Sequence, residues 1–283
     1  MNRLDLEAVD QLISLAIAED LGHADITTDA IVAGDTPGSA QIIAKKPTVV
    51  AGLFLVERIY RSLDPNITVE LLENDGRKVA AGTVLCHVEG PYAALLRGER
   101  TVLNFLQRLS GVATLTRRYV SAVKKSRCSV LDTRKTSPGM RSLEKYAVRA
   151  GGGTNHRTGL FDAVLIKENH IAAAGGVPAA IKLARKKVGK NVLVEIEVTN
   201  FEELVLAVEY GADIVLLDNM GLSDISRAVN MVGQRVELEV SGGVTLSTIR
   251  AIAATGVHRI SVGALTHSAP AADLSMLIVP GRK

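Results

Sequence analysis

The stretch VLVEIEVTNFEELVLAVEYGADIVLLDN, residues 192–219, decides the fold class of the chain. It begins and ends with runs of branched aliphatic residues, VLVEIEV (192–198) and DIVLLD (213–218), which are typical of buried strands. Between them, residues 201–211 have the apolar spacing of a helix, and Gly211 lies where that helix should end. A strand, a helix and a second strand in this order predict a parallel βαβ unit.

The same alternation runs through the second half of the chain. Further strand-like runs, with helical patterns between them, are SVLD (129–132), DAVLIK (162–167), VELEV (236–240) and HRISVG (258–263). A complete barrel of eight βα units takes about 250 residues. The six units found here therefore predict an α/β fold with an incomplete, six-stranded α/β barrel over residues 113–272.

An open, doubly wound sheet is the alternative architecture, because periodicity alone does not distinguish a closed sheet from an open one. Many doubly wound proteins bind dinucleotides through a GxGxxG turn that follows a strand. No such turn follows any predicted strand here, so the dinucleotide-binding version of this fold is disfavoured.

Residues 1–112 have a different pattern, which predicts a separate N-terminal α/β sandwich domain. A helical segment (6–22) is followed by strand-like pieces at 39–52 and 67–90. A long helical stretch over residues 92–125 then leads into the barrel, and we expect it to be interrupted near Gly111. The C-terminal tail, residues 273–283, is a candidate to pack with this first domain.

Composition excludes several classes of protein. The chain has 283 residues, of which 47% are hydrophobic, but no apolar run approaches the roughly 20 residues of a membrane helix. Acidic residues occur where a signal peptide would be apolar, so we expect a cytoplasmic protein without a membrane partner. A net charge of +3 is too balanced for nucleic-acid binding. Cys86 and Cys128 form no CxxC pair, which argues against a disulfide framework or a cysteine zinc site.

Polar or glycine-rich segments stand at or near the C-terminal end of nearly every predicted strand. In chain order they are Asp132 to Lys135, Lys167 and Glu168, Glu195 and Glu197, Asp218 and Asn219, Glu239 with Ser241 to Gly243, and Gly263. The carboxyl ends of the strands form the active-site face of α/β barrels. The pattern therefore predicts an active site at that rim.

The basic residues of this half of the chain suit anionic ligands. Those that can bind carboxylates and pyrophosphate are Arg134, Lys135, His156, Arg157 and Lys167. Arg141, Lys145 and Arg149 follow the i, i+4, i+8 spacing of one helix stripe, so we expect them on a solvated helix face instead.

Two carboxylates and two glycine turns complete the candidate site. Glu197 and Asp218 lie on neighbouring strands and suit ribose hydroxyls or a Mg²⁺ ion that bridges to phosphates. An ion pair with a nearby Lys or Arg is the alternative for each carboxylate. SGGV (241–244) and SVGA (261–264) follow the last two strands, where backbone N–H groups and a helix N-terminus can bind a phosphate.

The segment LDTRKTSPGMRSLEKYAVRAGGGTNHRTGLFDAVLIKENHI, residues 131–171, resembles the signature region of quinolinate phosphoribosyltransferases. The resemblance covers nearly the whole chain, through AEDLGHADITTDA (18–30), GERTVLNFLQRLSGVATLT (98–116), VEIEVTN (194–200), VLLDNM (215–220) and LEVSGGVT (238–245). Several long motifs in the same order make the match specific. For the fold, the resemblance implies an N-terminal α/β sandwich joined to an incomplete α/β barrel.

The resemblance also implies roles for individual residues. The positions that would hold the two carboxylates of quinolinate and the phosphates are Thr133, Arg134, Lys135, His156, Arg157 and Lys167. Glu197 and Asp218 would lie near the ribose and the metal of phosphoribosyl pyrophosphate, and with Lys135 and Lys167 they form the implied catalytic set. The 5′-phosphate would be bound by Ser241, Gly242, Gly243 and Gly263, with Val262, Ala264 and His267 beside them. Arg100 would reach the active site of the neighbouring subunit in a homodimer.

The implied reaction joins quinolinate and phosphoribosyl pyrophosphate to give nicotinate mononucleotide, pyrophosphate and CO2, a step in the de novo biosynthesis of NAD. Mg²⁺, held mainly by the pyrophosphate and assisted by Glu197 and Asp218, is the implied cofactor. The alternatives are a related transferase acting on another base, of the molybdate-transport-associated type, and a non-catalytic ligand-binding homologue. Arg134, His156 and Arg157 favour quinolinate over another base, and the intact catalytic set favours an enzyme.

Overall fold

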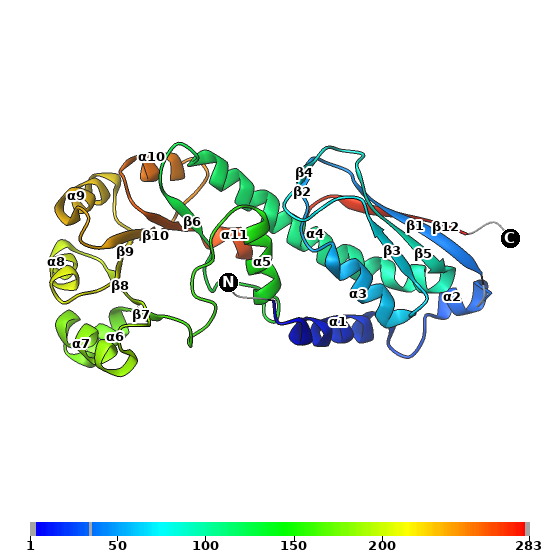
Figure 1. Ribbon diagram of the computed structural model, residues 1–283, viewed down its shortest axis with the longest axis horizontal. Helices are drawn as coiled ribbons and strands as arrows, with labels where there is room; N and C mark the ends of the chain where they lie inside the picture. Colours follow the sequence, from blue (N-terminus) through cyan, green and yellow to red (C-terminus); the bar gives the residue numbers. More distant parts are fainter. Residues whose placement is uncertain (1–3, 34–35, 281–283) are drawn as a thin grey trace. The chain divides into compact units, whose positions relative to one another are not determined.

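The computed structural model describes residues 4–33 and 36–280 of the chain (Figure 1). It contains two compact units. The first comprises Met1–Arg117, Ser137–Gly152 and Ser268–Lys283, as far as these are described, and the second comprises Arg118–Thr136 and Gly153–His267. Residues 137–152 belong to the first unit by their contacts, although they lie between two strands of the second along the chain. The predicted domain boundary between residues 112 and 113 stays a prediction.

The second unit contains the predicted six-stranded parallel sheet. Its strands are β6 (Ser129–Leu131), β7 (Val164–Ile166), β8 (Val194–Val198), β9 (Ile214–Asp218), β10 (Glu237–Ser241) and β11 (Arg259–Ser261). Their spatial order is β6-β11-β10-β9-β8-β7, so each strand from β7 to β10 lies beside its successor, and β6 lies beside β11. A doubly wound sheet would reverse this order at a switch point. The circular order, with one break between β6 and β7, confirms the incomplete barrel and excludes the open alternative.

Helices follow the strands of the second unit in the predicted alternation. They are α6 (Glu168–Ala174), α7 (Val177–Val188), α8 (Phe201–Glu209), α9 (Leu222–Val232), α10 (Ile249–Ala254) and α11 (Ala264–His267). The first turn of α8 is capped by Asn200, whose side chain accepts a hydrogen bond of 2.9 Å from the Glu203 N–H. α9 buries Ile225, Ala228 and Val232, which share one helix face. Figure 1 shows α7, α8 and α9 on the outer side of the strands.

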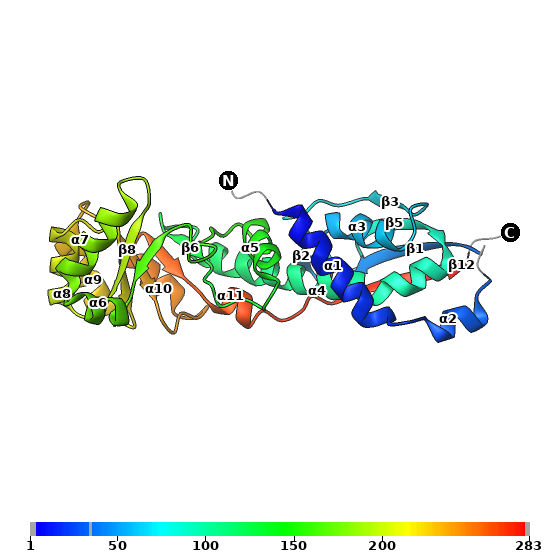
Figure 2. The same cartoon turned by 90° about the horizontal axis from the view of Figure 1, so that it is seen from below.

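The first unit is built on a four-stranded sheet. Its strands, in spatial order, are β12 (Leu274–Pro280), β1 (Pro37–Ala44), β5 (Val84–Pro91) and β3 (Thr68–Leu71). Every neighbouring pair is antiparallel, and alternate residues of β1 are buried, as expected when one face of a sheet packs on a core. β12 pairs with β1 from Gly38 to Ala44, so residues 274–280 form an edge strand of this sheet (Figure 2). A separate small sheet joins β2 (Thr48–Val49) and β4 (Lys78–Val79).

Helix α4 (Tyr92–Ala122) is continuous, so the predicted interruption near Gly111 is wrong. The glycine serves packing instead. A Cβ at this position would lie 3.1 Å from the carbonyl carbon of Pro270 and 3.2 Å from Cα of Ala271. Only a residue without a side chain allows the segment before β12 to approach the helix this closely.

Helix α5 (Arg141–Ala150) corrects a second expectation. Lys145 is 2% exposed, so the predicted stripe of Arg141, Lys145 and Arg149 is not a solvated face throughout. The neighbouring Glu144 is also buried, and its Oε1 accepts hydrogen bonds from Arg108 Nη2 (2.6 Å) and Ser137 Oγ (2.9 Å). Charged residues of α5 therefore take part in packing within the first unit.

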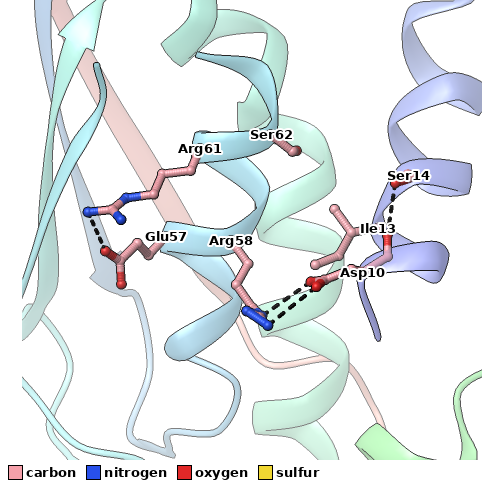
Figure 3. A pocket seen from close by; sticks show the side chains of 7 residues that line it. All are labelled: Asp10, Ile13, Ser14, Glu57, Arg58, Arg61 and Ser62. Carbon is pink, nitrogen blue, oxygen red and sulfur yellow. Dashed lines mark hydrogen bonds and ion pairs between the residues drawn. The ribbon is translucent and has the colours of Figure 1, made fainter. Parts of the chain in front are cut away.

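The remaining helices of the first unit are α1 (Leu6–Leu21), α2 (Ile26–Ile31) and α3 (Phe54–Leu63). A hollow of about 410 Å³ lies between α1 and α3 (Figure 3). Its charged groups pair with one another, because Arg58 Nε lies 3.2 Å from Asp10 Oδ1 and Arg61 Nη2 lies 2.8 Å from Glu57 Oε1. None of the helices in the described ranges has the length and apolar character of a membrane span.

Candidate functional site

The strand register of the second unit brings polar side chains onto one face of the sheet. Glu197 of β8 lies beside Leu216 of β9, which in turn lies beside Glu239 of β10. Two residues further along, Asp218 lies beside Ser241. Because side chains at every second position of a strand share a face, all five point to the same side. This side, at the carboxyl ends of the strands, is where the sequence predicts the active site.

A cavity of about 480 Å³ opens at this rim. Its lining residues come from the strands β7 to β11 and from the loops that follow the strands, including the loop after β6. They are Thr133, Arg134, Lys135, His156, Arg157, Leu165, Lys167, Glu197, Leu216, Asp218, Asn219, Ser241, Gly242, Gly243 and Ser261. The basic group, both carboxylates and the first glycine turn predicted from the sequence therefore surround one cavity.

Of the second glycine turn, 261–264, only Ser261 lines the cavity. Val262 is buried, and its N–H donates to the Leu131 carbonyl (2.8 Å). A Cβ on Gly263 would lie 3.2 Å from the imidazole of His267 and 3.2 Å from Cδ of Lys135. Neither these three turn residues, Val262, Gly263 and Ala264, nor His267 lines the cavity, and their contact with a phosphate stays a prediction.

Arg100 belongs to α4 in the first unit. Its side chain is 62% exposed, and its Nη2 lies 4.0 Å from Glu99 Oε1. At this distance and exposure the ion pair stabilises the fold little. The predicted contact of Arg100 with a partner's active site stays a prediction.

The basic wall of the cavity, formed by Arg134 and Arg157, has a hydrogen-bond donor that is available to a ligand. Arg134 Nε is buried and has no hydrogen-bond partner in the described structure. Arg157 Nη1 donates to the Ala163 carbonyl (3.3 Å), and burial together with the charge of Arg134 lowers the pKa of Arg157. Two neighbouring guanidinium groups repel each other, and an anion bound between them offsets this repulsion. This wall is therefore suited to carboxylates.

Glu197 and Asp218 are the carboxylates of the cavity lining. Lys167 Nζ pairs with Glu197 Oε2, so the ion pair considered as the alternative for Glu197 exists inside the cavity. Asp218 Oδ2 accepts a hydrogen bond of 2.9 Å from Asn219 Nδ2. Both carboxylates are partly exposed to the cavity, which leaves oxygens available to a ligand.

The first glycine turn follows β10. Gly242 (φ 94°) and Gly243 (φ 58°) both have the left-handed backbone that side chains disfavour. Successive residues with such dihedrals, next to a strand end, are typical of loops that present N–H groups to a phosphate. The turn therefore has the backbone required for the predicted role.

A buried charge cluster consists of His156, Glu195, Glu239 and Arg259, and His156 is the member that also lines the cavity. His156 Nε2 lies 3.0 Å from Glu195 Oε2 and 3.4 Å from Glu239 Oε1. Arg259 Nε donates to Glu239 Oε2 (2.8 Å). The Arg157 N–H donates to His156 Nδ1 (2.7 Å), so protein groups engage both ring nitrogens and hold the imidazole in one orientation.

Burial and neighbouring charges both shift the pKa values of this cluster. Burial lowers the pKa of His156, but the hydrogen bond to Glu195 and the charges of Glu239 and Glu195 outweigh it, and the pKa is raised. Burial and the charge of Glu195 raise the pKa of Glu239. The carboxylates therefore favour a second proton on the histidine, whose uptake would end the hydrogen bond from the Arg157 N–H because an imidazolium only donates.

Two sets of residues have the donor chemistry of a metal site. His156, Glu195 and Glu239 offer ligand atoms within 4.8 Å of one another. However, Glu195 is already engaged by the His156 imidazole, and Glu239 is engaged by the Arg259 guanidinium. Glu197 and Asp218 face the cavity with carboxylate oxygens, the ligands that Mg²⁺ prefers. Lys167 occupies one oxygen of Glu197 and the Asn219 amide occupies one oxygen of Asp218, so each carboxylate keeps one oxygen for a ligand. The cavity residues thus fit a Mg²⁺ ion that takes most of its ligands from substrate and water.

Both parts of the chain match models of known protein domains. Residues 112–277 match the sequence model of the quinolinate phosphoribosyl transferase C-terminal domain, and residues 25–110 match that of the N-terminal domain. The chain belongs to the quinolinate phosphoribosyltransferase family.

Relatives within the family cover the chain almost completely. A probable nicotinate-nucleotide pyrophosphorylase (carboxylating) of Bacillus subtilis (strain 168) is 42% identical over 276 residues, which are 98% of this chain and 94% of the relative. The solved nicotinate-nucleotide pyrophosphorylase of Francisella tularensis is 44% identical, with a TM-score of 0.94 over 98% of both chains. NadC from Streptococcus pyogenes is 37% identical, with a TM-score of 0.95 over 100% of both chains.

In this quinolinate phosphoribosyltransferase family member, sequence reasoning missed the cavity residues Leu165 and Leu216. It named Asn219 and Ser261 only as parts of a strand end and a glycine turn, with no role of their own. Leu165 and Leu216 each precede a predicted site residue by two positions, so strand periodicity contained the signal. Asn219 stands in the family motif but carries no charge, and the sequence pattern does not indicate what its side chain contacts. Its role depends on a glycine that is 23 positions away in the chain.

Proposed function

We propose that this protein transfers the phosphoribosyl group of phosphoribosyl pyrophosphate to quinolinate with loss of CO2, which gives nicotinate mononucleotide and pyrophosphate. The observation that carries the proposal is the single cavity in which two arginines, two carboxylates and a glycine turn face one another. A substrate with two carboxylates needs the cations, and a phosphorylated ribose needs the acceptors and backbone N–H groups. This reaction serves the biosynthesis of NAD.

The residues divide by chemistry. Arg134 and Arg157, with Thr133 and His156 beside them, bind the carboxylates of quinolinate. Lys135 and Lys167 neutralise the pyrophosphate, because a departing group with this charge needs cations close by. Ser241, Gly242 and Gly243 bind the 5′-phosphate together with Gly263, which lies beside Lys135.

Bond changes follow from this arrangement. The pyridine nitrogen of quinolinate attacks C1 of the ribose as the bond to pyrophosphate breaks, and Glu197 and Asp218 stabilise the positive charge that develops there. The carboxylate on ring carbon 2 then leaves as CO2, and the adjacent positively charged ring nitrogen stabilises the electron pair that remains on this carbon. A proton from solvent completes the product. Positioning within the cavity contributes most of the remaining acceleration.

Mg²⁺ is the proposed cofactor, held mainly by the pyrophosphate, with Asp218 and Glu197 as candidate protein ligands. When bound, it neutralises charge on the departing pyrophosphate. Removal of divalent ions with a chelator should abolish turnover, and added Mg²⁺ should restore it. A cytoplasmic location stays an expectation.

A homodimer is part of the proposal, with Arg100 of each subunit supplied to the active site of the other. Arg100 is exposed and its ion pair with Glu99 is long, so it is available to a partner. Arg100→Ala and Arg157→Ala proteins should each be nearly inactive. If the two are unfolded together and refolded, half of the dimers are hybrids, and each hybrid has one site with both arginines. Activity should then return to about a quarter of wild type. A mixture that stays inactive, although hybrids are shown to form, would place Arg100 in its own chain's site.

A product assay tests the base that the enzyme uses. Purified protein with phosphoribosyl pyrophosphate and Mg²⁺ should release CO2 from carboxyl-labelled quinolinate in a one-to-one ratio with nicotinate mononucleotide. Nicotinate in place of quinolinate serves as the control and should be a poor substrate, because one carboxylate leaves part of the basic wall unpaired. Efficient turnover of nicotinate without turnover of quinolinate would overturn the assignment.

A further inference from the structure

Asn219, the residue that follows β9, has an unusual backbone. Its φ is 53°, and among the described residues no other non-glycine residue has a positive φ. Asparagine tolerates this left-handed region better than most residues, but it still costs free energy relative to glycine. Such a residue next to a binding cavity suggests that its side chain has a function that glycine could not supply.

The side chain and backbone of Asn219 connect two parts of the cavity. Its N–H donates to the carbonyl of Ser241 (3.1 Å), and its Nδ2 donates to Asp218 Oδ2 (2.9 Å). A carboxylate only accepts hydrogen bonds, so this contact decides which end of the amide faces Asp218. One polar residue therefore contacts both the end of β9 and the end of β10.

The other face of the amide packs on the glycine turn. A Cβ on Gly242 would lie 2.6 Å from Asn219 Cγ and 3.1 Å from its backbone nitrogen, and it would overlap Asn219 Oδ1. Gly242 is therefore required for two reasons: its φ of 94° and the carboxamide that occupies the space of a side chain. The amide in turn limits how far the turn can move.

We propose that Asn219 is a positioning residue that couples the carboxylate of Asp218 to the glycine turn 241–243. By occupying Oδ2, it holds Asp218 in one rotamer and directs Oδ1 toward the ligand. By packing on Gly242, it sets the spacing between that carboxylate and the N–H groups of the turn. This inference rests on the proposed function, in which Asp218 and the turn bind the ribose and the 5′-phosphate of one substrate. Asn219 is thus assigned to the phosphoribosyl side of the cavity rather than the quinolinate side.

The key variant is Asn219→Gly, which keeps the left-handed backbone and removes only the amide. Loss of a hydrogen bond to a charged group should raise KM for phosphoribosyl pyrophosphate about tenfold or more, while KM for quinolinate changes less than about threefold. Asn219→Asp, which keeps the shape but places a like charge beside Asp218, should show the same selectivity with a larger loss. Asn191→Gly is the matched control, since Asn191 is exposed in a loop outside the cavity, and both KM values should stay at wild-type levels.

A second measurement does not depend on turnover. Amide hydrogen exchange of residues 241–243 should become faster in Asn219→Gly and stay unchanged in Asn191→Gly, because only the first variant releases the turn. Equal rises in both KM values, or unchanged exchange in the turn, would overturn the positioning role. Failure of the wild-type protein to use quinolinate would instead overturn the proposed function, and the exchange result would still decide whether Asn219 holds the turn.

Discussion

Glu195 and Glu197 lie two residues apart on β8 and on the same face of the sheet, yet their surroundings differ. Glu197 lines the cavity and pairs with the half-exposed Lys167, whereas Glu195 is 3% exposed and contacts His156. The same contrast exists on β10, where Ser241 faces the cavity and Glu239 is fully buried. Depth along the strand therefore separates a cavity layer (Lys167, Glu197, Asp218, Ser241) from the buried charge cluster.

The difference has an energetic consequence. Exposed ion pairs contribute little to stability and remain available to ligands, whereas a buried charge without a partner is strongly destabilising. We therefore expect changes in the cavity layer to affect binding and turnover, and changes at Glu195, Glu239 and Arg259 to affect folding. His156, which belongs to the cluster and also lines the cavity, should affect both. The predictions below test this division.

The largest effect on stability should come from Arg259→Ala, which leaves Glu239 buried without its guanidinium partner. Breaking such a pair should lower the free energy of unfolding by about 3–5 kcal/mol in urea denaturation. Arg250→Ala, at an exposed position, is the control and should change it by less than about 0.5 kcal/mol. A loss below about 1 kcal/mol for Arg259→Ala would mean that Glu239 is protonated or solvated, and the two layers would not differ as described.

Arg157→Ala should affect the binding of one substrate much more than that of the other. Loss of a charge-assisted contact should weaken quinolinate binding by about 1.5–3 kcal/mol, with a much smaller effect on phosphoribosyl pyrophosphate, in calorimetric titration of each ligand. Ser241→Ala should give the reverse, with weaker binding of the phosphorylated substrate. Equal losses for both ligands in both variants would show that the division of the cavity is wrong.

The buried charge cluster should also give the stability of the protein a pH dependence. The raised pKa of His156 means that the folded state holds this proton more tightly than the unfolded state. The stabilisation is fully present below the ordinary value of 6.5 and is lost as pH rises through the higher folded pKa. The difference in unfolding free energy between wild type and His156→Gln should therefore decrease as pH rises from 6 toward 9. A difference that stays constant over this range would show that His156 is neutral in the folded protein.

The smallest effect on stability is expected in the cavity layer. Lys167→Met removes the ion pair with Glu197, but the lysine side chain is 47% exposed. The free energy of unfolding should therefore change by less than about 1 kcal/mol. Turnover should fall sharply in the same variant, because the proposed neutralisation of pyrophosphate is lost. A stability loss as large as that of Arg259→Ala would remove the contrast between the layers.

Much of this molecule could be predicted from local sequence patterns. The six strands, the helices between them and the polar residues at the strand ends follow from apolar periodicity, which is a property of neighbouring residues. The incomplete barrel followed from the count of these units, and the structure confirms it. The basic group, Glu197, Asp218 and the first glycine turn could be placed at one rim, since parallel strands have their carboxyl ends at the same edge.

Only the tertiary structure decided what the pattern left open. The need for glycine at position 111 of α4 comes from the approach of Pro270, and the burial of Lys145 comes from packing within the first unit. The partners of Glu195 and Glu239, and the fit of Asn219 on Gly242, join segments that are distant in the chain. The alternation of apolar residues along a strand specifies which face a side chain occupies. Its depth in the cavity and its contacts arise when separate strands come together in a given register, and no local pattern contains that information.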